Sequence, residues 1–158
     1  MKNELSLVYA AKIVPDEGGY VVTFRDLENV FAEGDSYEEA LFNAQEVLDI
    51  LLLDMTQDEL DIPEPTVCHK NEVPIAVSPE VAVPVLLHKL RKDRHYTQAD
   101  VARSMGVSYQ NYQQIELGKN ITLKSLKRAA AALGAIVEIK LHAGPVRANE
   151  PKVTAPTL

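Results

Sequence analysis

The stretch Thr97–Lys119, TQADVARSMGVSYQNYQQIELGK, carries the clearest structural pattern of the 158-residue sequence. Thr97 precedes a helical pattern and Asp100 follows three residues later, which is the spacing of an N-terminal helix cap. Gly106 permits a left-handed turn, and Ser108 is suited to cap a second helix. The stretch therefore predicts two short helices joined by a tight turn.

Apolar residues at helical spacing indicate how these two helices would pack. We expect Val101 and Ala102 of the first helix and Ile115 of the second to face inward, and Val107 to fill the corner between the helices. Uncharged hydrogen-bonding groups then lie on the outward side of the second helix, namely Tyr109, Gln110, Gln113 and Gln114. Because a glutamine amide can form two hydrogen bonds with adenine in the major groove, the pattern indicates a DNA-reading helix. A plain helical bundle with one polar face is the alternative.

Two further helices should flank this pair. Ser78 and Pro79 form a helix start from which a helix should run to about Asp93, and another is predicted over Thr122–Leu133. The alternating residues Ile136–Leu141 predict a short C-terminal strand or a dimer contact. Basic side chains near the pair suit contacts with DNA phosphates, and these are Arg103, Lys119, Lys124, Lys127 and Arg128.

The distribution of charge divides the chain. Residues 1–78 carry 4 Lys/Arg and 17 Asp/Glu, a net charge of −13, whereas residues 79–142 carry 10 and 5, a net charge of +5. Such asymmetry predicts two modules with oppositely charged partners, although solubility alone could explain an acidic half. We expect an acidic module over 1–78, a basic helical module over 79–142 and a disordered tail over 143–158.

The acidic half shows strand alternation followed by one long helical stripe. Strands are predicted over Leu5–Val14 and Tyr20–Phe24, with a short third strand near Val30–Glu33. Ser36 and Glu39 have the spacing of a capping box and would begin a helix. The apolar stripe of that helix, which we interpret as core, is Ala40, Leu41, Ala44, Val47, Leu48, Leu51, Leu52 and Met55.

A connection and a fourth strand complete this half. Residues 56–72 are polar and acidic and are interpreted as a linker, and Val73–Val77 could form a strand in which Pro74 favours an edge position. The predicted fold class is therefore α+β, with a β-β-β-α-β module followed by an all-α domain that ends in a short strand.

The basic half resembles the Cro/repressor (XRE) class of helix-turn-helix domains. The TQADVA opening, Gly106 and the IE-x-GK ending carry the likeness. The resemblance implies that Gln98 touches a DNA phosphate and that Tyr109, Gln110 and Gln114 read bases. It also implies phosphate or secondary contacts from Ser108, Asn111, Gln113 and Lys119.

The acidic half resembles the HicB antitoxin family. The carrying residues are Gly18–Phe24, Asp26-Leu27, Gly34-Asp35-Ser36 and Glu38-Glu39-Ala40, and the likeness covers about residues 5–140. Glu28-Asn29 stands where the family usually has Pro-Gly. The resemblance implies a partial ribonuclease-H-like module that binds and occludes a small basic mRNA-cleaving toxin, HicA, and an antitoxin that represses its own operon.

The toxin contact is expected at or near acidic and aromatic residues of the strands and turns. These residues are Asp16, Glu17, Tyr20, Phe24, Asp26, Glu28 and Glu33. An acidic module would attract a basic ribonuclease and speed the encounter. For DNA, we expect a homodimer on an inverted repeat, held together by the last helix and Ile136–Leu141, with pairing of dimers into tetramers left open.

Enzymatic and metal-binding functions are the competing class. Asp16, Asp26, Glu33 or Asp35 could in principle hold Mg²⁺ for nuclease chemistry, but such residues beside turns are usually caps and solvated loops. Cys68-His69 is a poor zinc site because the chain has one cysteine. We expect no catalytic activity, no metal and no cofactor.

A stand-alone transcription factor with a ligand-sensing N-terminal module is the other alternative. It would keep the DNA contact and lose the toxin partner, and a neighbouring gene for a short basic protein would discriminate the two. The sequence has no apolar run long enough to span a membrane, and the single cysteine excludes an intramolecular disulfide. Because the N-terminal residues include no apolar run, we expect no signal peptide. We therefore expect a cytoplasmic protein with no membrane partner.

Overall fold

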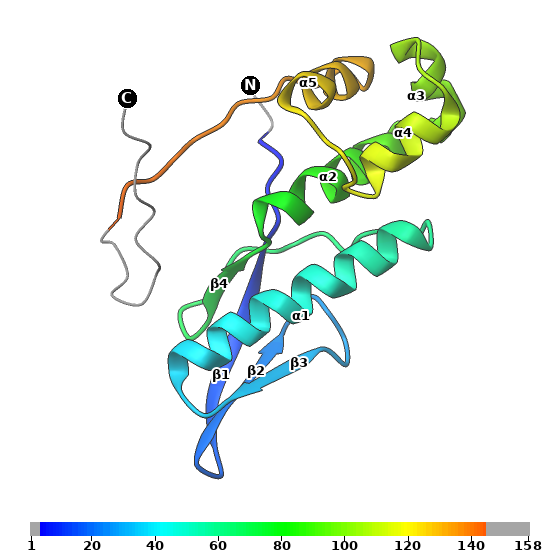
Figure 1. The fold of residues 1–158 in the computed structure, drawn as a ribbon. Helices are drawn as coiled ribbons and strands as arrows, with labels where there is room; N and C mark the ends of the chain where they lie inside the picture. Colours follow the sequence, from blue (N-terminus) through cyan, green and yellow to red (C-terminus); the bar gives the residue numbers. More distant parts are fainter. Residues whose placement is uncertain (1–3, 145–158) are drawn as a thin grey trace.

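An antiparallel sheet covered on one face by a long helix forms the N-terminal part of the computed structural model, which describes residues 4–144 (Figure 1). Its elements are β1 (Val8–Asp16), β2 (Gly19–Phe24), β3 (Phe31–Gly34), α1 (Tyr37–Gln57) and β4 (Val73–Ala76). The strand order is β3-β2-β1-β4, so β4 occupies an edge as its proline predicts. The β-β-β-α-β order and the α+β class are confirmed.

The strand register places alternate residues of β1 against α1. Tyr9 pairs with Ile75 of β4, and Ile13 pairs with Val22 of β2. These side chains belong to one apolar core with the inward stripe of α1, which confirms the stripe as core. The first strand begins later than predicted, because Leu5 lies outside the ladder and stays 42% exposed.

The start of α1 depends on a close approach of two backbones. The Ser36 hydroxyl accepts a hydrogen bond from the Glu39 N–H at 3.1 Å, as predicted. The Glu39 carboxylate, however, accepts from the N–H of Asp35 rather than from that of Ser36, so the capping box closes one residue early. A Cβ on Gly34 would lie 2.3 Å from the Ala40 nitrogen, and only glycine fits there.

The turn between β2 and β3 has Glu28-Asn29 where the resemblance led us to expect Pro-Gly. Asn29 adopts a left-handed conformation with φ of 60°. Asparagine is among the few residues that tolerate this conformation, so it replaces glycine at little cost. Leu27 just before the turn is buried in the core and anchors the loop.

The helices of the C-terminal part are α2 (Pro79–Asp93), α3 (Gln98–Met105), α4 (Tyr109–Glu116) and α5 (Leu123–Ala132). Thr97 and Asp100 form a complete capping box at the start of α3, and the Ser108 hydroxyl caps α4. Gly106 ends α3 in a left-handed conformation with φ of 70°. The predicted helix pair and its turn are confirmed.

Helix α2 lies between α1 and the other helices and belongs to both cores (Figure 1). Its Val81 and Val85 pack into the core of the sheet, whereas Leu87 packs with α3, α4 and α5. Ser78 precedes α2, but its side chain makes no cap bond, and its N–H donates to Asp49 of α1 at 2.9 Å. The two parts therefore share an element at their boundary.

The predicted strand over Ile136–Leu141 is absent from the part of the chain that the structure describes. Ile136 and Leu141 are 86% and 92% exposed, and residues 136–141 pair with no strand within residues 4–144. Alternation alone cannot form a strand, because a ladder needs a partner for its backbone groups. The predicted disordered tail, residues 143–158, falls mostly on residues 145–158, outside the described range.

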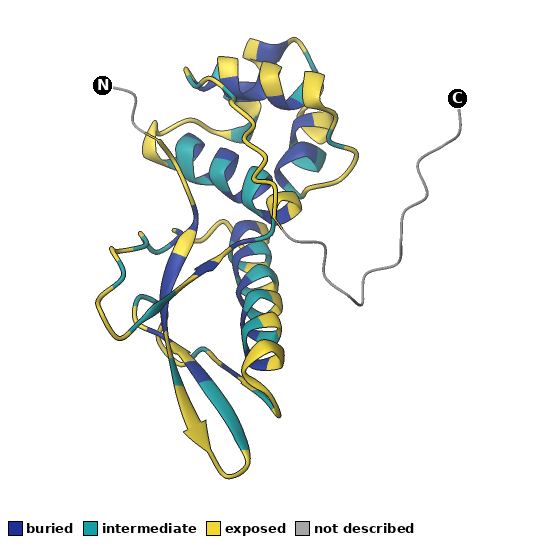
Figure 2. Ribbon diagram, turned by 90° about the vertical axis from the view of Figure 1, so that its left-hand side faces the viewer, coloured by how far each residue is buried: buried dark blue, intermediate teal, exposed yellow. Residues whose placement is uncertain are grey.

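The exposed end of the β1–β2 hairpin projects away from the helical part (Figure 2).

No helix between residues 4 and 144 is long and apolar enough to cross a membrane.

Candidate nucleic-acid interface

Helix α4 presents the polar side chains that the sequence predicts for DNA contact. Tyr109, Gln110 and Asn111 are exposed in its first turn, whereas Gln113 and Gln114 are half-buried. Lys119 is exposed after the helix. The Ser108 hydroxyl caps the helix by accepting a hydrogen bond from the Asn111 N–H at 3.2 Å. The structure therefore brings the predicted base readers together on one short helix.

The opposite side of α4 is buried, and this orientation exposes the polar side. Tyr112 and Ile115 pack into the helical core. The Tyr112 hydroxyl donates a hydrogen bond to Glu116 Oε1 at 2.7 Å. Burial, reinforced by the nearby Glu116 carboxylate, raises the pKa of the Tyr112 hydroxyl, which stays protonated as a donor.

A buried ion pair joins α4 to α2. Arg91 is 3% exposed and Glu116 is 1% exposed. Arg91 donates from Nε to Glu116 Oε1 at 2.5 Å and from Nη2 to Oε2 at 3.1 Å. This two-point geometry fixes direction as well as distance, so the pair sets the angle of α4 against α2.

Neighbouring donors hold the Glu116 carboxylate ionised. Burial alone would raise the pKa of Glu116, but His88, Arg91, Tyr112 and Gln98 together lower it to about 2. Burial likewise disfavours the Arg91 charge, yet hydrogen bonds to Glu116 and Glu59 hold the pKa of Arg91 above its ordinary value. Both charges are therefore retained inside the domain.

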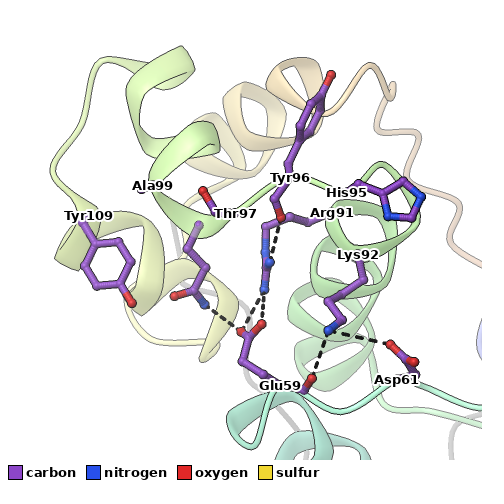
Figure 3. Close-up of a pocket in the computed structure, with 10 residues that line it drawn as sticks. Glu59, Asp61, Arg91, Lys92, His95, Tyr96, Thr97, Ala99 and Tyr109 are labelled. Carbon is purple, nitrogen blue, oxygen red and sulfur yellow. Dashed lines mark hydrogen bonds and ion pairs between the residues drawn. The ribbon is translucent and has the colours of Figure 1, made fainter.

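Gln98, the predicted phosphate contact, is engaged within the molecule. Its side-chain amide donates to Glu116 Oε2 at 2.9 Å and to Glu59 Oε1 at 3.2 Å. Glu59 comes from the segment after α1, and its two carboxylate oxygens each lie 2.8 Å from Arg91 Nη2 (Figure 3). The N-terminal part thus reaches the edge of the predicted DNA-binding surface.

An open groove of about 740 Å³ lies at this junction. Tyr96 and Tyr109 border it from the helical part, and Glu59 and Asp61 border it from the segment after α1 (Figure 3). Thr97 and Gln98 also line it, so the groove adjoins the start of α3. An approaching DNA backbone would meet carboxylates beside the expected phosphate contact.

His88 completes the polar cluster and is wholly buried. Its Nε2 lies 2.8 Å from the Leu60 carbonyl, and its Nδ1 lies 3.7 Å from Glu116 and 3.9 Å from Glu59. These three side chains could converge on a cation, but the Arg91 guanidinium already lies within hydrogen-bonding distance of each of them. Arg91 supplies the positive charge that a metal would supply.

The other candidate metal ligands do not gather in the same way. Among residues 4–144, Cys68 and His69 belong to no group of three ligands, and neither do Asp16, Asp26, Glu33 and Asp35. The His69 N–H donates to Glu72 at 2.8 Å, and the Asp26 carboxylate accepts from the Thr66 N–H and hydroxyl. A backbone hydrogen bond from Thr66 lowers the pKa of Asp26 most strongly.

The residues predicted to meet the toxin are spread over the sheet part rather than gathered. Asp16 and Glu17 are exposed at the hairpin tip, and Glu28 and Glu33 are exposed at and after the next turn. Tyr20 is half-buried, and its ring meets Tyr37 edge-on with centroids 5.8 Å apart.

Phe24 differs from the other members of that set. It is 6% exposed and packs in the core beside α1, because it alternates with the outward Thr23. It therefore offers no surface to a partner, and its role is structural.

Sequence reasoning missed the buried cluster of His88, Arg91, Tyr112 and Glu116, and the partly exposed Glu59 that contacts it. One signal was present, because Arg91 lies four residues after Leu87 on the inward face of α2. A charged residue on an apolar stripe demands a buried partner. The sequence alone did not say which carboxylate supplies it.

Comparisons with known proteins agree with this arrangement. Residues 8–86 match the family described as HicB_like antitoxin of bacterial toxin-antitoxin system, and residues 87–136 match a helix-turn-helix family. Antitoxin HicB 2 of Photorhabdus laumondii subsp. laumondii is 31% identical over 132 residues, which cover 83% of this chain and 94% of that protein. Antitoxin HicB of Escherichia coli (strain K12) is 29% identical over 128 residues, which cover 80% and 93%. The chain therefore belongs to the HicB-like antitoxin family and carries a helix-turn-helix domain at its C-terminal end.

Proposed function

We propose that this antitoxin occludes a HicA-like mRNA-cleaving toxin with its N-terminal module and represses its own operon through α4. The observation that carries the proposal is the union in one chain of an acidic HicB-like module and a helix-turn-helix with an exposed polar helix. The net charge of −13 over residues 1–78 favours association with a basic ribonuclease. Steric cover of the toxin's active site is the proposed mode of inhibition, and the chain itself is proposed not to be an enzyme.

Toxin contact is proposed for the exposed carboxylates of the sheet part. Asp16, Glu17, Glu28 and Glu33 are free of the core. Tyr20 and Asp26 have partners within the chain, so their contribution would be indirect. Rim charges of this kind change association rates more than they change dissociation rates.

For DNA, we propose that Tyr109, Gln110 and Gln114 read bases and that Lys119 and Gln98 contact phosphates. Two such helices, about 34 Å apart in a dimer, would occupy an inverted repeat. Exposed apolar side chains of Ile136, Ile139 and Leu141 support dimerisation through this segment, where each copy could give the other a strand partner. Light scattering of the purified chain would give the dimer and would also show whether dimers pair into tetramers.

The test uses the full chain and its genomic neighbour. Co-expression should prevent growth arrest by the toxin, and the purified complex should bind the DNA upstream of its own gene. Growth arrest despite an intact antitoxin would contradict occlusion, and a monomer by light scattering at micromolar concentration would contradict the dimer. Because mRNA and operator DNA are the expected targets, the proposed location is the cytoplasm.

The alternative is a stand-alone regulator whose N-terminal module senses a ligand. The two modules, residues 1–78 and 79–142, would then communicate through α2, which packs in both cores. A neighbouring gene for a short basic protein that binds the chain would exclude this alternative.

A further inference from the structure

We propose that Glu59 competes with DNA for Gln98, so that the segment after α1 lowers the DNA affinity of the helix-turn-helix while it is docked. The inference rests on the proposed phosphate contact of Gln98. It concerns Glu59 and Arg91, which meet at the groove (Figure 3), and Gln98, whose side-chain amide donates to Glu59.

Glu59 stands at a backbone position that disfavours it. The N–H of Leu60 donates to the Met55 carbonyl and that of Glu59 donates to the Thr56 carbonyl, which is the Schellman pattern at the end of a helix. Glu59 occupies the left-handed position of this motif with φ of 56°, where glycine is usual. A non-glycine residue is strained there, because its Cβ comes close to the following carbonyl oxygen. Glu59 adopts this position despite the strain, and its carboxylate bonds to Arg91 and Gln98 and lies 3.9 Å from His88 Nδ1.

Both N–H donors of the Gln98 side-chain amide already have partners. A side-chain amide has two N–H donors, and those of Gln98 point to Glu116 and Glu59. A phosphate contact must displace one of them. The Glu116 carboxylate is 1% exposed, whereas the Glu59 side chain is 46% exposed and its bond to Gln98 is the longer one. Glu59 is therefore the partner that DNA would displace.

Charge works in the same direction as donor occupancy. Glu59 and Asp61 place carboxylates in the groove beside Thr97 and Gln98, and Arg91 and Lys92 line the same groove, so that opposite charges balance there while Glu59 is docked. The Glu59 carboxylate offsets the attraction of Arg91 and Lys92 for a phosphate next to Gln98, and this effect is largest at low salt. Moving the Glu59 carboxylate away would remove both the competitor and this offset.

The competing carboxylate is held in place from α2. Lys92 Nζ donates to the Glu59 carbonyl at 3.1 Å and lies 3.8 Å from Asp61. Lys89 pairs with Glu64, and His88 contacts the Leu60 carbonyl. The segment is thus docked by basic side chains on successive turns of one helix, and it leads directly back to α1 of the toxin-binding module.

The test measures binding of the full chain to operator and to unrelated duplex DNA. Glu59→Gln removes the charge, and Glu59→Gly removes the side chain while suiting the left-handed backbone, so that variant should fold. Both should bind both DNAs about five-fold or more tightly than the unchanged chain, at the lower end of ordinary coupling between sites. Asp58→Asn is the matched control, since it makes the same charge change one residue away, and its affinity should change less than about twofold.

The role of Gln98 separates competition from general charge effects. In a Gln98→Ala background, at least half of the gain from Glu59→Gly should disappear, because the competed donor is gone. Unchanged or weaker DNA binding by both Glu59 variants, or a full gain without Gln98, would overturn the proposal. Unrelated DNA also carries phosphates, so a failure of operator recognition would refute the proposed repressor function while leaving this comparison decisive.

Discussion

The two parts of this molecule are held together by different kinds of contact. The sheet part has a core of aliphatic and aromatic side chains, in which α1 covers one face of the sheet. The helical part also has an apolar core, but a polar cluster adjoins it, with Arg91 and Glu116 paired and almost without exposure. Apolar burial is non-directional, whereas a two-point ion pair fixes orientation. The first part is thus specified by pattern, and the second depends in addition on particular partners.

Breaking the ion pair should have the largest effect. Arg91→Met leaves the Glu116 carboxylate buried without its cation, and we expect a loss of about 3–5 kcal/mol in the free energy of unfolding. The affinity for DNA should also fall, because α4 loses the contact that orients it against α2. Urea unfolding followed by circular dichroism measures the first effect and fluorescence anisotropy with labelled DNA measures the second.

Lys92→Met is the matched control for that change. It removes a positive charge from the next residue of α2, whose side chain is 34% exposed, and should cost less than about 1 kcal/mol. Similar losses from Arg91→Met and Lys92→Met would show that the buried pair contributes no more to the free energy of unfolding than an exposed cation does.

Breaking the apolar core should have a somewhat smaller and more local effect. Leu48 lies wholly buried on the inward stripe of α1, and Leu48→Ala should lower the free energy of unfolding by about 3 kcal/mol. Ile50→Ala, on the outer side of the same helix and 62% exposed, should change it by less than about 0.5 kcal/mol. Equal losses at the two positions would mean that α1 packs differently from this structure.

This contrast also explains what the sequence could predict. The caps by Ser36, Thr97 and Ser108 and the inward stripe of α1 were predictable because they depend on residues three or four apart. The outward face of α4 followed from the same periodicity. Local rules therefore sufficed for the elements and for the residues placed on each face.

Contacts between distant residues were not predictable in this way. Arg91 bonds to Glu116 and Glu59, which are 25 and 32 positions away in the chain. No spacing rule selects those carboxylates among the 23 acidic residues. Residues 136–141 form no strand within the described chain for the same reason, because their alternation is visible in the sequence and the partner that a strand needs is not.

Lowering the pH should reduce the stability of the helical part before it reduces that of the sheet part. The folded pKa of Glu116, about 2, lies below its ordinary value of 4.5, so its stabilisation is present above pH 4.5 and is lost as the pH falls from about 4.5 to about 2. Arg91 stays charged throughout. We expect a loss of a few kcal/mol, seen as earlier urea unfolding of α2–α5 at pH 3 than at pH 6 by residue-resolved amide signals.

Glu116→Gln provides the control for the acid effect, because it removes the titrating carboxylate and keeps its shape. The stability of this variant should be lower at pH 6 and should change much less between pH 6 and pH 3. If the variant keeps the full acid sensitivity of the unchanged chain, other carboxylates cause it.

The smallest effects on stability should come from the exposed side of α4, where function and folding separate. Gln110 is exposed, and Gln110→Ala should leave the free energy of unfolding within about 0.5 kcal/mol while weakening operator binding by about 1–3 kcal/mol more than binding to unrelated DNA. Lys119→Ala, which removes the proposed phosphate contact, should weaken binding to both DNAs about equally. Paired titrations of both variants on both DNAs measure the difference. If Gln110→Ala also weakens both equally, Gln110 does not read a base, and the specificity of this antitoxin must come from Tyr109, Gln114 or the shape of the DNA.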